Sequence, residues 1–98
     1  MNNNEIIDLA NKYMGQKIVA LCTRYMYWGV LSSLAQLNGE PALIFDAPCA
    51  IVEVSGISES NEPVCTDLVT KPLAVFIKHI EIVFQPKWVD AEIKAYHN

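Results

Sequence analysis

Several short segments place apolar side chains at consecutive positions, and these segments constrain the fold most. The clearest are residues 18–22, 42–45 and 75–77. Successive side chains of a strand point to opposite faces, so a strand of this kind needs cover on both faces. One thin domain of 98 residues can hardly provide that cover everywhere. The pattern therefore predicts self-association, with a helix laid across one face as a partial alternative.

The composition limits the classes of protein that the chain can belong to. An apolar content of 52% with 18% charged residues excludes a disordered chain, and 98 residues form one domain. No apolar run approaches the roughly 18–20 residues of a membrane span, and the first residues do not resemble a signal peptide. Cys22, Cys49 and Cys65 are far apart and form no Cys-x-x-Cys pair. We therefore predict a cytoplasmic protein with no disulfide framework, no metal and no cofactor.

The chain begins with one amphipathic helix. Ile6, Leu9, Ala10 and Tyr13 follow the spacing of a single apolar helix face. Either Asn3 or Asn4 is expected to cap its first turn, and Gly15 suits the left-handed residue that ends it. A helix this short is marginal alone and must dock on the rest of the domain.

Strand and turn signals follow the helix. Gly29 lies inside an apolar strand, where glycine indicates a sharp bend or a close packing contact. Asn38-Gly39 is the strongest hairpin-turn signal in the chain. Residues 55–71 read as a long polar loop, and a break is expected near Lys78-His79. The predicted strands are 17–24, 26–34, 42–45, 49–54 and 73–84.

The chain is expected to divide into a folded domain, residues 1–86, and a C-terminal tail, residues 87–98. Trp88, Ile93 and Tyr96 are the apolar anchors of this tail. It is predicted to form a short helix or a strap across a neighbouring subunit.

Three motifs in this order resemble those of Sm-like proteins. The first motif comprises residues 15–20, the aromatic stretch 25–28 and residues 29–31. The second is residues 44–47, and the third comprises residues 75–79 and 82–86. The resemblance is to a bacterial member of the family with altered RNA-binding motifs. It implies a mainly β fold, in which an N-terminal α-helix precedes a strongly bent, five-stranded antiparallel small barrel. It also implies a homo-oligomer, assembled as a ring through the edge strands of neighbouring subunits.

The resemblance also implies where RNA would bind, and there the chain departs from the family. Sm-like proteins use an aspartate and an asparagine between the second and third strands, and an arginine-glycine pair in the last motif. Here the aspartate position is Ala35 or Gln36, and only Asn38 can stand in for the asparagine. Lys78-His79 replaces the arginine-glycine pair, which keeps a positive charge but loses the planar fork and the flexible glycine.

The aromatic stretch 25–28 has two interpretations. Alternation sends Tyr25 and Tyr27 to one face of the strand and Met26 and Trp28 to the other. A core face paired with an interface face is the favoured interpretation. Stacking on a ligand or on RNA bases is the alternative.

No pattern in the sequence supports catalysis. His79 has Glu81 as its only local acid, and on a strand the two would share a face and form an ion pair. A structural or surface histidine is favoured over a catalytic one. No metal-ligand spacing, phosphate-binding glycine loop or nucleophile elbow is present in the sequence. We therefore predict that the protein is not an enzyme and has no catalytic residues.

The predicted function is that of an oligomeric binding or interaction module. Its partners are expected to be other copies of itself and an unidentified protein or small molecule, with no membrane involved. The alternative is an Sm-like protein that binds single-stranded RNA. The net charge of −4 and the scattered basic residues disfavour that alternative. The residues predicted to contact the ligand or the RNA are Tyr27, Asn38, Lys78 and His79.

Overall fold

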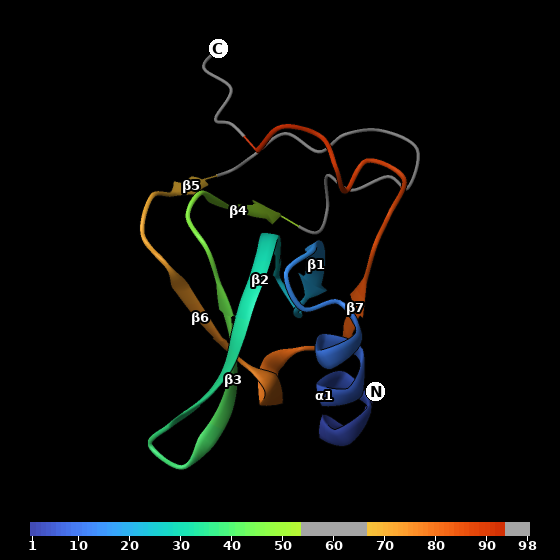
Figure 1. The fold of residues 1–98 in the computed structure, drawn as a ribbon, viewed down its shortest axis with the longest axis vertical. Coiled ribbons are helices and arrows are strands. Elements are labelled where there is room, and N and C mark those ends of the chain that lie inside the picture. Colours follow the sequence, from blue (N-terminus) through green and yellow to red (C-terminus); the bar gives the residue numbers. More distant parts are fainter. Residues whose placement is uncertain (54–66, 94–98) are drawn as a thin grey trace.

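The protein is mainly β, with one N-terminal helix and a seven-stranded antiparallel sheet that does not close into a barrel (Figure 1). The computed structural model describes residues 1–53 and 67–93. The elements in chain order are α1 (Asn3–Lys12), β1 (Lys17–Leu21), β2 (Tyr25–Leu37), β3 (Glu40–Phe45), β4 (Cys49–Glu53), β5 (Asp67–Val69), β6 (Leu73–Phe76), the short 3₁₀ helix η2 (Ile77–His79) and β7 (Ile82–Phe84). Among the described residues, no helix is long and apolar enough to cross a membrane.

Strand β2 organises the sheet because its two halves have different partners. Its first residues pair with β1 and β4, whereas its second half pairs with β3 up to the turn at Asn38-Gly39. Gly29 lies where the partner changes, and a Cβ there would be 3.4 Å from side-chain atoms of Cys49 and Phe45. The close packing expected at Gly29 is therefore present.

The hairpin turn and the break near residue 78 are confirmed. Asn38 and Gly39 both have positive φ, 51° and 78°, as this turn requires. This geometry lets β2 continue to Leu37, three residues beyond the predicted end. The predicted last strand, 73–84, is interrupted by η2 and so becomes β6 and β7.

The predicted loop 55–71 contains one strand that the sequence analysis missed. Asp67–Val69 forms β5 by pairing with β4, with Ala50 opposite Leu68. A strand of 3 residues is determined by its partner rather than by its own sequence. Residues 54–66 of the predicted loop and strand lie outside the described residues.

Both faces of the sheet are covered within a single chain. Ile18 and Ala20 of β1 are fully buried in a first core cluster, to which Ile6 and Ala10 of α1 also belong. Val19, between them, is fully buried in a second cluster on the opposite face. The apolar runs that predicted self-association are thus explained without a second copy, and the homo-oligomer stays a prediction.

The second face is covered by the segment that follows β7. Trp88, Val89 and Ile93 are buried in the second cluster, so this segment, drawn in orange to red along the top of Figure 1, lies across the sheet of its own chain. The Trp88 ring is edge-on to the ring of Trp28 with centroids 5.1 Å apart, and Trp28 Nε1 donates to the Val89 carbonyl over 2.9 Å. We call residues 87–93 the strap; Tyr96, the third predicted anchor, lies outside the described residues.

Helix α1 begins one or two residues earlier than the sequence suggested. Asn2, and neither Asn3 nor Asn4, is the N-cap, since its Oδ1 accepts from the Glu5 amide over 2.9 Å. The amide of the third helical residue is the usual partner of such a cap. Gly15 follows the helix with a φ of 81°, as predicted.

Candidate functional site

A cleft of about 620 Å³ opens between the β1–β2 turn and β6. Residues 22–25 and Tyr27 line one side of it, and residues 73–76 and 78–81 line the other. β6 pairs with β3, and no β3 residue lines the cleft. The cleft therefore runs along the other edge of β6, where the sheet is open, and its volume is in the range of small-molecule and peptide sites.

Aromatic side chains line both sides of the cleft. Tyr25 and Tyr27 contribute from β2, while Met26 and Trp28 are buried in the second cluster on the opposite face. The predicted alternation along this strand is thus confirmed. Phe76 contributes from β6, and its ring is edge-on to that of His79 with centroids 6.5 Å apart.

The cleft is basic, although the chain is acidic. Arg24 and Lys78 line it against one carboxylate, that of Glu81, whereas the whole chain has 7 lysines and arginines against 11 acids; the ring of His79 also lines it. Glu81 is engaged by Thr23, whose hydroxyl donates to Oε1 over 3.4 Å. The cleft therefore suits a ligand with negative charge.

The two fully charged cations of the cleft differ in availability. Lys78 Nζ lies 2.8 Å from Oε2 of Glu40, in an exposed ion pair of the kind that contributes about 0–1 kcal/mol. Arg24 is exposed and forms no ion pair within the described part of the chain. Arg24 is therefore the cation that a ligand can engage without first displacing a carboxylate.

Three of the four predicted site residues come together in the cleft. Tyr27, Lys78 and His79 line it, although they are separated by 50 residues of sequence. Asn38 does not line it, because it lies exposed in the turn between β2 and β3.

Sequence analysis missed Arg24 and Phe76 as lining residues. Arg24 lies in none of the motifs, Phe76 lies in an apolar part of the motif 75–79, and only the folded position of β6 brings Phe76 opposite the β1–β2 turn. The predicted ion pair of His79 with Glu81 was wrong. His79 belongs to the helical turn η2 rather than to a strand, so residues two apart do not share a face, and its ring contacts Phe76 instead.

Two ionisable side chains on the β1–β2 side of the cleft, Cys22 and Tyr27, have raised pKa values. Burial, helped by the carboxylate of Glu81, raises the pKa of Cys22 from 9.0 to about 11. Burial also raises the pKa of Tyr27, with Cys22, Cys49 and Tyr25 as smaller contributors. An activated nucleophile has a lowered pKa, so neither group is activated. The described residues contain no cluster of three or more metal-ligating side chains.

The raised pKa makes Cys22 a slow nucleophile. We expect iodoacetamide to alkylate Cys22 at pH 8 about a hundredfold more slowly than a free cysteine peptide, because the thiolate fraction falls by about that factor. Mass spectrometry of the digested protein gives the rate at Cys22 separately from the other cysteines. The rate should keep rising between pH 9 and pH 11, and a plateau near pH 9 would contradict the assignment.

Comparison with protein families, with curated proteins and with solved structures found no match to this chain. The resemblance to Sm-like proteins therefore depends on the sequence motifs alone.

Proposed function

We propose that the protein is a non-enzymatic binding module that holds an anionic ligand with an apolar or aromatic part in the cleft between the β1–β2 turn and β6. One observation carries this proposal: a basic, aromatic cleft in an acidic chain. Tyr25, Tyr27 and Phe76 supply apolar and stacking surface, and Arg24 supplies a cation without an ion-pair partner in the described part of the chain.

An Sm-like fold is part of this proposal. Pairing runs in the order β7-β1-β2-β3-β6, and the long strand β2 changes partner from β4 to β3 between Trp28 and Leu31. β4 continues the line of β3 along β2, and β5 pairs with β4. This order of strand pairing supports the expected small barrel, although β6 and β7, at its two ends, do not pair with each other.

The second candidate function is the binding of single-stranded RNA. Tyr27, Lys78 and His79 lie in one cleft, where an aromatic ring and cations could hold a base and a phosphate. Two features weigh against it: Lys78 is paired with Glu40, and the net charge of the chain is −4.

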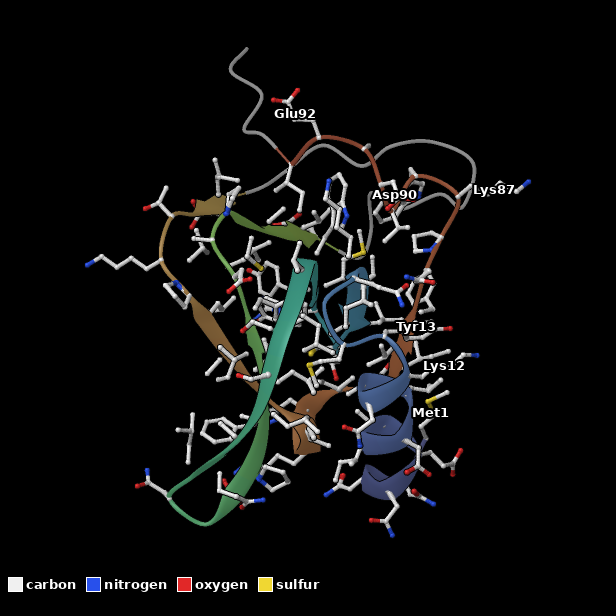
Figure 2. The ribbon with its side chains drawn as sticks, viewed as in Figure 1. Met1, Lys12, Tyr13, Lys87, Asp90 and Glu92 are labelled. Atoms are coloured by element: carbon white, nitrogen blue, oxygen red, sulfur yellow. The ribbon has the colours of Figure 1, made fainter. Side chains whose placement is uncertain are left out.

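The proposal predicts that Arg24→Glu weakens binding of an aromatic anion. With anilinonaphthalene sulfonate as the fluorescent probe, we expect saturable binding to the wild-type protein. Arg24→Glu should weaken it by about tenfold or more, since it replaces a charge-assisted contact with repulsion. Lys87→Glu is the matched control, because it makes the same change of charge at an exposed lysine outside the cleft, at the right of Figure 2.

Three results would contradict the proposal or favour the alternative. Absence of saturable binding to the folded wild-type protein, or equal weakening by both variants, would remove the cleft as the site. Titration with oligo(U) and oligo(A) at low and moderate salt tests the alternative. Oligonucleotide binding that is tighter than sulfonate binding and is lost in Lys78→Glu would make RNA the ligand; no affinity at low salt would exclude it.

A further inference from the structure

One edge of β6 has no partner in the described part of the chain. Its residues, Leu73–Phe76, pair with β3 on one side only. None of the other backbone hydrogen bonds recorded between described residues involves residues 73–76. In an antiparallel pair, alternate residues direct both their amide and their carbonyl groups away from the partner strand. Two residues of β6 therefore present these groups at its open edge.

This open edge lies in the cleft and is accessible. All four residues of β6 line the cleft, and the exposed residue among them, Ala74, has a side chain too small to block it. A row of unpaired amide and carbonyl groups is complementary to the backbone of another extended chain. Neither a nucleotide nor a small aromatic acid offers that complement.

The side chains around the edge specify the composition of such a chain. Arg24 has no ion-pair partner in the described part of the chain, and Lys78 lines the cleft from its exposed pair with Glu40, so acidic side chains are favoured beside Arg24. Tyr25 and Phe76 provide apolar surface for every second side chain, because a strand turns alternate side chains to one face.

We propose that the ligand of the cleft is an extended peptide segment of another protein, in which acidic and apolar residues alternate, and that it adds to the sheet along the open edge of β6. This inference rests on the proposed function and names the class of its ligand. Backbone pairing with β6 supplies affinity, and the basic, aromatic cleft selects the side chains.

The test uses a fluorescein-labelled peptide in which glutamate alternates with valine and phenylalanine. The comparison peptide has the same side chains in the same order but is N-methylated at every amide, which removes the donors that β6 carbonyls need. We expect the unmodified peptide to bind and the N-methylated one to bind about tenfold more weakly or worse. A third peptide, with lysine in place of glutamate, should also lose about tenfold. Amide hydrogen exchange of residues 73–76 should be slowed by the unmodified peptide alone.

The outcomes separate this inference from the proposed function. Equal binding of the N-methylated peptide would overturn strand addition while leaving a cleft that binds anions. Binding of the sulfonate probe without binding of any peptide would do the same. Failure of both probes would overturn both proposals. Saturating peptide should lower the mass found by light scattering or leave it at that of one chain; an assembly that saturating peptide does not disperse would show that a second copy covers the edge.

Discussion

Replacing Trp28 with alanine is expected to lower the free energy of unfolding by about 3–5 kcal/mol. The Trp28 side chain is 1% exposed and is the largest fully buried side chain in the described part of the protein. Its ring packs against Trp88, and its Nε1 holds the strap through the Val89 carbonyl. The substitution therefore opens a cavity beneath the sheet and releases the segment that covers it.

Guanidinium unfolding followed by far-ultraviolet circular dichroism measures this effect. Fluorescence is less suitable, because the chain has only 2 tryptophans and the substitution removes one of them. Tyr25→Ala is the matched control on the same strand, since Tyr25 lies on the other face and is half-buried. We expect it to cost about 1 kcal/mol or less. Equal losses for the two variants would mean that the strap does not stabilise the sheet.

Trp28→Phe separates the hydrogen bond from the packing. Phenylalanine keeps most of the ring contact with Trp88 but leaves the Val89 carbonyl without the indole donor. An intermediate loss of about 1–3 kcal/mol is expected. Hydrogen exchange should then show the strap opening more readily while β1 and β2 stay protected.

The sequence predicted that both faces of the strands are covered and offered the helix as the cover of one face, but it did not predict that the strap covers the other. The alternation of Ile18, Val19 and Ala20 between two clusters follows from strand geometry alone. The position of the strap does not follow from strand geometry, because the hydrogen bond from Trp28 to Val89 joins residues that are 61 positions apart in the sequence. Apolar anchors near the end of a chain fit a neighbouring subunit as well as their own sheet, and only the path of the chain after β7 decides between them.

The candidate site was predictable where it depends on strand periodicity and not where it depends on topology. Alternation placed Tyr25 and Tyr27 on one face, and that face is the wall of the cleft. Phe76 was hidden in an apolar run, where nothing in its sequence context distinguishes a core residue from a lining residue. Asn38 was included through the family resemblance, and the structure places it in a turn outside the cleft.

Replacing Ile6 with aspartate is expected to undock helix α1 and to lower the free energy of unfolding by about 3–5 kcal/mol. The Ile6 side chain is fully buried in the first core cluster, where a carboxylate has no polar surroundings. The helix is 10 residues long, so it is not stable once its apolar face is lost. Guanidinium unfolding measures the loss, and circular dichroism measures the helix content that accompanies it.

The same substitution tests how the cleft is held in shape. Helix α1 packs against η2 and β7, and η2 carries Lys78 and His79 into the cleft. Undocking α1 should therefore also weaken binding of the sulfonate probe, although Ile6 does not line the cleft. Asn4→Asp is the control: it adds the same charge at an exposed position in the first turn of the helix, where the dipole favours it. If Ile6→Asp stayed folded and bound the probe as wild type does, the position of η2 would not depend on the helix.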